Sequence, residues 1–350
     1  MPQPLKFPAR EAHALRRWPA LACLALLLSA APARAQQQPE AQSKPAPAPV
    51  EVGEDEVIKI DTDLVLVDVT VTDAAGKPVR GLRPEDFKLY DDGEERQLAF
   101  VNVERRGGAE RPVAVVFAVD VSGSMTAEEM ERLRAAMRVF TEKMSGRDAL
   151  YALMSFGMSA KVRQEFTSDA AKMGRAFERL AREVEGLSTH TYDAVDDAVR
   201  LLVRKAPRTR DRKLMKRAVV VITDGFPVGD TVRPETVIER ANAAEVSVYT
   251  VTLPSYSRLL ASTGPRAPLP TPLDVSGLAE KTGGANHYAD AKDYEPLFRA
   301  LAEEVTSTYV LAFYPPEEKR RDGRSHTIRV EAPPGLFIRQ NRTTYKGEKP

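Results

Sequence analysis

The sequence is poor in cysteine, tryptophan and histidine, and it carries almost no net charge. Its 350 residues include one cysteine, one tryptophan and four histidines. The cysteine, Cys23, lies in an apolar stretch near the N-terminus, so the rest of the chain can form no disulfide and is compatible with an oxidising compartment. The formal net charge is +1 at pH 7, and this balance gives no reason to propose nucleic acid as a partner.

Long apolar runs are also missing beyond the N-terminal stretch, so no transmembrane segment is expected. Residues 1–35 have the pattern of a secretory signal peptide: several basic residues, the apolar run 21–28 and the small-residue site Ala33-Arg34-Ala35. Cleavage after Ala35 leaves 46 Lys and Arg against 49 Asp and Glu, a net charge of −3. We therefore expect a secreted or periplasmic protein.

Composition divides the rest of the chain into four segments. Residues 36–55 are rich in Gln, Pro, Ala and Glu without apolar periodicity, which is typical of a flexible linker. We expect a small β module at 56–108, an α/β domain at 109–307 and a further β segment at 308–350. A chain of this length is ample for more than one domain.

The two β segments are predicted to form one module. Valines occupy every second position of 64–72, which puts them on one face of a strand. Asp92-Gly93 predicts a hairpin that joins the runs 87–90 and 98–101. In the second segment, strands are expected at 308–314, 327–330 and 336–338. Each segment alone is too short to be well stabilised, so we expect the two to pack together.

Between these segments, strand and helix patterns alternate regularly. Strands are expected at 113–119, 151–156, 218–222, 246–252 and 286–289, with an antiparallel edge strand at 160–166. Helical spacing of apolar residues is found at 130–144, 173–184, 192–202 and 294–305. The alternation predicts an α/β fold with a doubly wound, mostly parallel, Rossmann-like sheet.

The most informative segment is Asp120-Val121-Ser122-Gly123-Ser124. It follows the buried-strand pattern of 113–119 and precedes a capping-box pattern that starts at Thr126. One carboxylate and two hydroxyls are therefore held in the turn at the C-terminal end of a strand, where open α/β sheets bind ligands. Hard oxygen donors without His or Cys favour Mg²⁺, Mn²⁺ or Ca²⁺ over zinc.

Asp120-x-Ser122-x-Ser124 resembles the metal-ion-dependent adhesion site of von Willebrand factor type A domains. In that family a threonine just before a helix and an aspartate after a later strand complete the site. Capping and turn formation could explain one such loop, but not three in the expected order. The resemblance therefore implies a divalent-cation site, with Mg²⁺ as the first choice, made by Asp120, Ser122, Ser124, Thr189 and Asp224.

One feature departs from the family pattern. Relatives usually carry a pair of glycines before the metal-binding threonine, whereas Leu187-Ser188 precede Thr189 here. Thr191 is therefore kept as the alternative ligand.

Both β segments resemble the secreted von Willebrand factor type A-related family described from Acidobacteria. The resemblance is carried by Val69-Thr70-Val71-Thr72-Asp73, Leu82-x-x-x-Asp86-Phe87 and Tyr309-x-Leu311-x-Phe313-Tyr314-Pro315. It covers nearly the whole chain after residue 35 and implies a β module before and after the metal-binding domain. The biochemical role of that family is poorly defined.

Two further segments and one histidine have open interpretations. Residues 204–217 hold eight basic residues and one acidic residue, and we favour a solvated connector over a docking patch for an anionic partner. Residues 254–272 contain five prolines and are expected to overhang the same sheet edge as the metal, unless they are a plain connector. His190, beside Thr189, is expected to be simply exposed.

The sequence favours a binding protein over an enzyme. Ser122 stands where a haloacid-dehalogenase-type phosphatase needs its second aspartate, neither serine lies in G-x-S-x-G, and metal hydrolases supply more carboxylates. The resemblance implies an adhesion-type function in which a protein partner offers an Asp or Glu carboxylate to the cation. A structural or assembly factor of the cell envelope, with a metal that serves folding, is the alternative. The sequence does not indicate the oligomeric state.

Overall fold

The computed structural model describes residues 64–102, 111–123, 125–180, 188–254, 270–290 and 292–348, all within the compact unit Ala46–Pro350. The predicted signal peptide, the predicted linker and positions 255–269 of the proline-rich segment lie outside the described residues, and so does Ser124.

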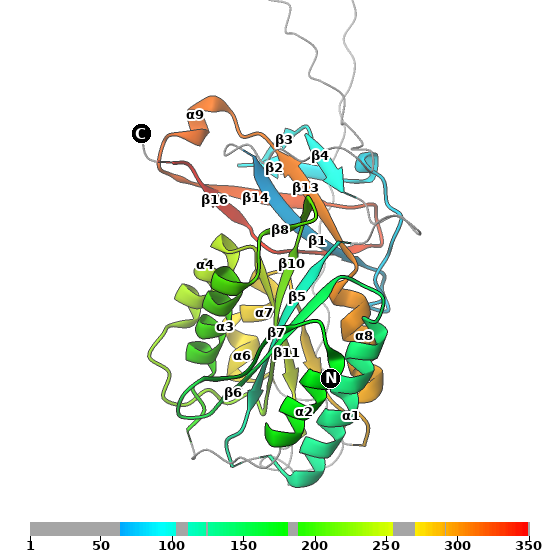
Figure 1. Ribbon diagram of the computed structural model, residues 1–350. Coiled ribbons are helices and arrows are strands. Elements are labelled where there is room, and N and C mark those ends of the chain that lie inside the picture. The colour runs from blue at the N-terminus through cyan, green and yellow to red at the C-terminus, as the bar shows by residue number, and fades with distance from the viewer. Residues whose placement is uncertain are drawn as a thin grey trace, which may run out of the picture. The chain divides into compact units, whose positions relative to one another are not determined.

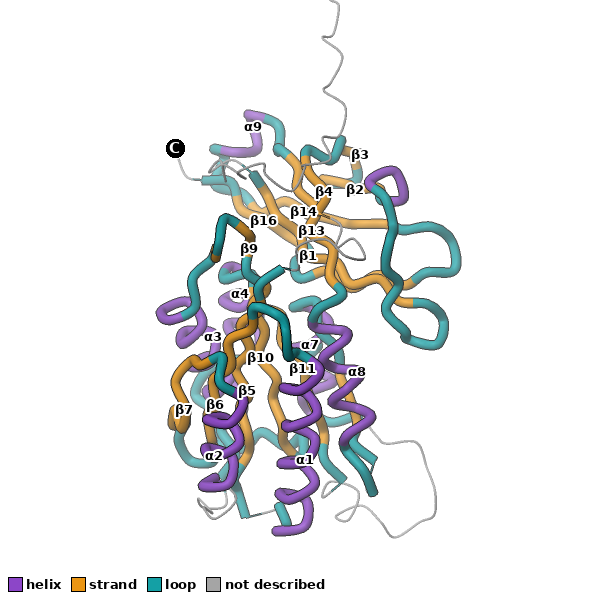
Figure 2. The backbone as a smooth tube through the Cα atoms, turned by 45° about the vertical axis from the view of Figure 1, so that its right-hand side comes forward, coloured by secondary structure: helices purple, strands orange, loops and turns teal. Residues whose placement is uncertain are grey.

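The central element is a six-stranded sheet with the order β12-β11-β10-β5-β6-β7 (Figures 1 and 2). All neighbouring strands are parallel except β6 and β7, which pair antiparallel at one edge. The strands are β5 (Val113–Asp120), β6 (Ala149–Phe156), β7 (Lys161–Thr167), β10 (Lys216–Thr223), β11 (Val246–Thr252) and β12 (Asn286–Tyr288). The predicted fold class and its antiparallel edge strand are confirmed.

Helices cover both faces of this sheet, which explains why its central strands β5 and β10 are buried along their whole length. One face packs against α1 (Ala127–Lys143), α2 (Ala170–Leu180) and α8 (Glu295–Val305). The other face packs against α3 (Thr191–Lys205), α4 (Pro234–Ala243), α6 (Pro272–Ser276) and α7 (Leu278–Lys281). Because side chains alternate along a strand, Phe117 packs on Phe140 of α1, while Val116 faces the opposite helices.

Helix α1 begins with the predicted capping box. The Thr126 side chain accepts a hydrogen bond from the backbone N–H of Glu129, at 3.2 Å, and the Glu129 carboxylate accepts one from the backbone N–H of Thr126, at 2.9 Å. Two helix-end donors are thus satisfied directly after the Asp120 loop, so α1 begins at a defined residue just beyond that loop.

Strands from both ends of the chain form a separate β module. One sheet has the order β15-β1-β13-β4 and the other β16-β14-β2-β3. The N-terminal strands are β1 (Val65–Thr72), β2 (Lys88–Asp91), β3 (Glu94–Arg96) and β4 (Phe100–Asn102), with a short helix η1 (Pro84–Asp86). The C-terminal elements are β13 (Thr308–Phe313), α9 (Glu317–Arg320), β14 (Ser325–Glu331), β15 (Phe337–Gln340) and β16 (Thr344–Lys346).

The pairing of β1 with β13 unites the two ends of the chain. They run antiparallel, with Val67 opposite Leu311, and both residues belong to one apolar cluster that includes residues of both sheets of the module. The smaller β module built from the N- and C-terminal flanks is therefore present, as the fold-class prediction stated.

The predicted hairpin has a different second strand. Asp92-Gly93 forms its loop, but β2 pairs with β3 (Glu94–Arg96), whereas β4 pairs with β13. The expectation that 98–101 is the hairpin partner was wrong, because the two-residue loop places Glu94 directly opposite Asp91 and leaves no room for a later strand.

The basic segment 204–217 is not simply a solvated connector. Thr209–Arg210 (β8) and Lys213–Leu214 (β9) form a two-stranded hairpin, and Lys216 and Arg217 are buried in β10. The prediction failed at the end of this segment because a buried acidic residue, distant in the sequence, compensates the lysine.

That acidic residue is Asp68 of β1. Its carboxylate accepts hydrogen bonds from the Arg111 guanidinium at 3.0 and 3.1 Å and from Lys216 Nζ at 3.0 Å. Lys216 Nζ also donates to Ser247 Oγ at 2.8 Å. Burial opposes ionisation of Asp68, but the charges of Arg111 and Lys216 lower its pKa to about 2. This buried ion cluster joins the β module to the N-terminal ends of β5 and β10.

Candidate metal centre

The first predicted ligand, Asp120, is the last residue of β5 and is fully buried. Its Oδ1 accepts a hydrogen bond from the backbone N–H of Ser122 at 2.8 Å, and its Oδ2 accepts one from the Thr223 hydroxyl at 2.7 Å. Ser122 is itself 6% exposed. The carboxylate is therefore held in one orientation by donors from the ends of two neighbouring strands.

Asp224 follows β10, the strand next to β5, and is 6% exposed. Its Oδ1 accepts a hydrogen bond from the backbone N–H of Phe226 at 3.2 Å, which tightens the turn after the strand. The next residue, Gly225, has a φ of +91°, and a Cβ there would lie 2.6 Å from the Thr271 side chain. Glycine is thus required both by the backbone conformation and by the close approach of residue 271.

The electrostatics of Asp120 indicate that its described surroundings lack a compensating positive charge. Burial raises the pKa of the Asp120 carboxyl, hydrogen bonds from Thr223 and Ser122 oppose the rise, and the negative charge of Asp224 adds to it. Among the described residues, no Lys, Arg or His forms an ion pair with either aspartate. Two buried carboxylates that repel each other beside hydroxyl groups fit a divalent cation with oxygen ligands, because such a cation would compensate both charges.

Thr189 lies on the third loop, directly before α3, and is 5% exposed. It exchanges two backbone hydrogen bonds with Val228 of the loop after Asp224, at 3.2 and 2.9 Å. The backbone N–H of His190 donates to the carbonyl of Gly157, which follows β6. The Thr189 loop is therefore tied to the ends of β6 and β10, so the three predicted loops meet at one edge of the sheet.

The alternative ligand, Thr191, is engaged differently. It is the first residue of α3 and fully buried, and its hydroxyl and its N–H both point to the carbonyl of Thr189, at 3.4 and 2.9 Å. This arrangement stabilises the turn before the helix and favours Thr189 as the residue that offers a hydroxyl to the cation.

A reciprocal pair of aspartates, which sequence reasoning missed, fixes these loops. The Asp193 carboxylate, in the first turn of α3, accepts hydrogen bonds from the backbone N–H groups of Thr231 and Val232 at 3.0 and 2.8 Å. In return, Asp230 Oδ1 accepts one from the backbone N–H of Asp193 at 2.9 Å. Because the N-cap residue His190 makes no side-chain cap, Asp230 satisfies a helix-end donor from outside the helix.

His190 is not simply exposed, contrary to expectation. Its side chain is 24% exposed, and its Nδ1 lies 3.2 Å from Asp193 Oδ2. Thr223 was missed as well, because a threonine at the end of an apolar strand has the pattern of an ordinary strand residue. The aspartate pair could not be found from the sequence, since Asp193 and Asp230 are 37 residues apart.

A second acidic cluster lies in the β module, and a lysine side chain already compensates its negative charge. Asp91, Asp92 and His326 lie close enough together to suggest metal ligands. Lys319 Nζ, however, lies 3.0 Å from Asp91 Oδ2 and 2.8 Å from Asp92 Oδ2. An ammonium group between the two carboxylates supplies the positive charge that a metal would bring, so we assign no metal to this cluster.

The sequence of residues 114–265 matches the family model of the von Willebrand factor type A domain. A comparison with curated proteins gives no match.

Several solved structures are similar to about half of the chain. The conserved hypothetical protein BatB from Bacteroides thetaiotaomicron is 18% identical, with 55% of this chain and 97% of that chain covered and a TM-score of 0.41. Proximal thread matrix protein 1 from the mussel byssus, described with a zinc-occupied MIDAS motif, is 14% identical, and the match covers 58% of this chain and 47% of that chain with a TM-score of 0.43. The SpRpn10 VWA domain is 14% identical, and the match covers 55% of this chain and 93% of that chain with a TM-score of 0.36.

Proposed function

Because the chain carries a von Willebrand factor type A domain, we propose that it is a binding protein of the adhesion type, which recognises a protein partner through a divalent cation. The observation that carries the proposal is the meeting of three polar loops at the C-terminal edge of the sheet, around two buried carboxylates. Mg²⁺ is the cation we favour, with Mn²⁺ and Ca²⁺ as alternatives.

In this proposal the cation is held by Asp120, Ser122, Ser124, Thr189 and Asp224. The aspartates provide charge, and the three hydroxyl-bearing residues provide neutral oxygen donors. A bound cation would supply Lewis acidity toward an incoming acidic group, because three of its five proposed protein ligands are neutral oxygen donors. Thr223 and the backbone of Ser122 keep the Asp120 carboxylate oriented for that role.

Exposed apolar side chains beside the site support a protein partner. Val228, whose backbone pairs with Thr189, is 55% exposed, and Met158, which follows the hydrogen-bonded Gly157, is 64% exposed. Single exposed apolar residues are common on protein surfaces, but these two flank the same proposed ligand. A protein surface could cover both side chains while its carboxylate reaches the cation.

The donor set favours binding over catalysis. Metal hydrolases usually hold their ions with more carboxylates and activate a water, whereas this site offers two carboxylates, both buried and both oriented by hydrogen bonds. Turnover of a generic phosphoester that requires Mg²⁺ and disappears in Asp120→Ala would establish the enzymatic alternative.

The second candidate is a structural or assembly factor of the cell envelope whose metal serves folding. It is favoured by the burial of Asp120, since a cation that relieves the repulsion from Asp224 stabilises the folded state. Thermal unfolding with and without EDTA, compared with partner binding, separates the two: a structural metal changes stability and leaves recognition alone.

Capture of partners from an extract of the source cells tests the proposed function. The wild type should retain a partner in Mg²⁺ and release it in EDTA, Thr189→Ala should retain less, and Asp120→Ala should retain none. Asp197→Ala, an exposed position on α3, is the matched control and should behave as the wild type. Retention that is the same in Mg²⁺ and EDTA, and unchanged in Asp120→Ala, would exclude a cation-dependent interaction.

We further propose that the protein is exported and acts outside the cytoplasm. The signal-peptide pattern of residues 1–35 supports this. Separately, no helix among the described residues is long and apolar enough to cross a membrane. N-terminal sequencing of protein recovered outside the cytoplasm should begin at Gln36. Retention of Met1 in that fraction would contradict cleavage after Ala35.

A further inference from the structure

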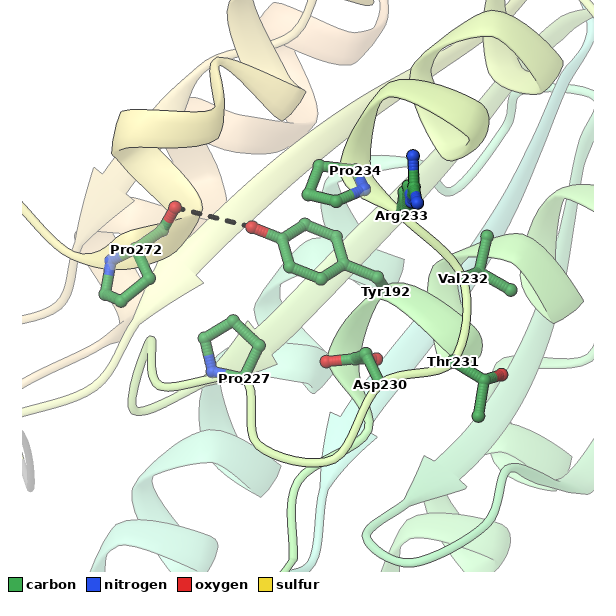
Figure 3. A pocket seen from close by; sticks show the side chains of 8 residues that line it. All are labelled: Tyr192, Pro227, Asp230, Thr231, Val232, Arg233, Pro234 and Pro272. Atoms are coloured by element: carbon green, nitrogen blue, oxygen red, sulfur yellow. Dashed lines mark hydrogen bonds between the residues drawn. The ribbon is translucent and has the colours of Figure 1, made fainter.

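A hollow of about 350 Å³ lies beside the candidate metal centre. Three segments line it: the start of α3 with Tyr192, the loop 227–234 and the start of α6 with Pro272 (Figure 3). The first two segments also carry or adjoin the proposed metal ligands. Tyr192 is three residues from Thr189 and Pro227 is three residues from Asp224, so each of these two walls lies within roughly 11 Å of a proposed ligand along the chain.

The walls of the hollow are mostly apolar and held in place. The Tyr192 ring lies between Pro227, Pro234 and Pro272, with Val232 nearby (Figure 3). Proline rings fix the backbone φ angle, and the Tyr192 hydroxyl donates a hydrogen bond to the carbonyl of Pro272 at 3.4 Å. The adjoining loop is bound to α3 by Asp193. A guest side chain therefore meets a preformed surface and orders little of the protein on binding.

The polar groups of the hollow do not select a cationic guest. Asp230 Oδ1 is taken by the backbone N–H of Asp193, and Asp230 Oδ2 is buried with no hydrogen-bond partner among the described residues. A guest in the hollow therefore reaches neither oxygen directly, since Oδ1 is engaged and Oδ2 is shielded from the surface. Arg233, which lies on the other side of the Tyr192 ring, is exposed and forms no ion pair with any described residue. Its positive charge disfavours a basic guest and favours an acidic segment.

We propose, resting on the proposed function, that this hollow is the specificity subsite for the partner. It receives an apolar side chain of the segment whose Asp or Glu reaches the cation. An extended segment spans roughly 7 Å between a residue and the second one after it. The recognised feature is therefore an acidic residue with an apolar residue about two positions away.

Synthetic peptides displayed on a surface provide the probe. Three ten-residue peptides share a neutral Gly/Ser background and contain Asp-Gly-Leu, Asp-Gly-Ser or Asp-Gly-Lys. Binding is measured by interferometry in Mg²⁺ and in EDTA. Burial of a leucine-sized side chain corresponds to about tenfold or more in affinity, so in Mg²⁺ the leucine peptide should bind at least about tenfold more tightly than the other two.

A variant of the wall gives a second measurement that leaves the metal ligands intact. Pro272 is the first residue of α6, where a glutamate is well tolerated because it interacts favourably with the helix N-terminus. Its hydrogen bond with Tyr192 uses the backbone carbonyl and is kept. Pro272→Glu should abolish the preference for the leucine peptide without changing Mg²⁺ affinity. Val275→Glu places the same charge on the same helix, at a 78% exposed position outside the hollow, and should keep the preference.

The outcomes separate the subsite from the metal-dependent function. Equal, Mg²⁺-dependent binding of the leucine and serine peptides would overturn the subsite and leave the proposed function standing. Tighter binding of the lysine peptide, or binding of no peptide, would also overturn it. A leucine preference that Pro272→Glu removes but EDTA does not would uphold the apolar hollow and count against a cation-dependent function.

Discussion

At the scale of single residues, the site depends on a buried charge that the protein orients but does not neutralise. Asp120 has two hydrogen-bond donors, from Ser122 and Thr223, and a negative neighbour in Asp224. The sequence predicted the carboxylate and its neighbouring hydroxyls, because their spacing after a strand is distinctive. It did not reveal Thr223, whose role is visible only when β5 and β10 lie side by side.

Replacement of Thr223 by valine tests this orientation. The change keeps the side-chain shape but removes the donor to Asp120 Oδ2, so we expect the free energy of unfolding to fall by about 1.5–3 kcal/mol. Mg²⁺ affinity should fall as well, because the carboxylate loses its fixed orientation. Denaturant unfolding and calorimetric titration measure the two effects.

Thr252→Val is the matched control for this substitution. Thr252 pairs with Thr223 across β10 and β11, is 3% exposed, and its hydroxyl has no partner among the described residues. Its replacement should be neutral or stabilising, since no hydrogen bond is lost. Equal destabilisation by both substitutions would show that the Thr223 hydroxyl has no special role.

At the scale of elements, two loops that are distant in sequence position the site by exchanging hydrogen bonds. Asp193 on α3 binds the backbone of the loop before α4, and Asp230 of that loop binds the backbone of α3. Strands, helices and the capping box of α1 follow from local patterns, which explains why they were predicted well. The partners of a loop depend on the tertiary fold, so this exchange could not be read from local patterns, whereas the true hairpin partner of β2 follows from its two-residue loop.

Asp193→Ala should release the loop that follows Asp224. It removes the acceptor of two backbone N–H groups, and changes around metal ligands of this kind typically weaken metal binding by about 10–100-fold. We expect Mg²⁺ affinity to fall in that range, together with the melting temperature. Asp197→Ala, one helical turn further along α3 and exposed, should change stability by less than about 0.5 kcal/mol. Unchanged Mg²⁺ affinity in Asp193→Ala would show that the loops hold the site without this exchange.

At the scale of the whole described unit, the ion cluster of Asp68, Arg111 and Lys216 couples the β module to the α/β domain. Its members come from β1, from the segment just before β5 and from the start of β10. Composition alone made Lys216 look like part of a solvated basic segment, because a buried charge is recognised only with its partner. The β module shows the same dependence on distant segments. Its two halves were predicted from their strand patterns, but the pairing of the strands was not.

Asp68→Ala should destabilise the protein strongly. It leaves two buried cations without their counter-ion, and loss of one member of a buried ion pair typically costs about 3–5 kcal/mol. Asp148→Ala, which removes the partner of the half-exposed Arg210, should cost less than about 1 kcal/mol. Denaturant unfolding measures both. Similar small losses in the two variants would show that the cluster does not couple the module to the domain.

The contribution of Asp68 should also depend on pH. Its folded-state pKa, about 2, is below its ordinary value of 3.8, so the unfolded chain binds the proton more readily. The stability that it contributes is therefore complete above about pH 4 and is lost as the pH falls toward 2. The difference in unfolding free energy between wild type and Asp68→Ala should shrink over that range, and a difference that stays constant from pH 5 to pH 2 would contradict the assignment.

The central claim is that Asp120 holds a divalent cation, and calorimetric titration of Mg²⁺ tests it most directly. Wild type and Asp197→Ala should bind Mg²⁺ with the same affinity, and Asp120→Ala should show no binding while the sheet remains folded. Thr189→Ala should weaken binding less than Asp120→Ala, because it removes a neutral donor that water can partly replace. At a Mg²⁺ concentration one hundred times the Kd, the wild type should gain about 2.7 kcal/mol of stability that Asp120→Ala lacks. Equal Mg²⁺ affinity in wild type and Asp120→Ala would show that this loop only caps a helix, and the account of a cation-dependent binding protein would fail with it.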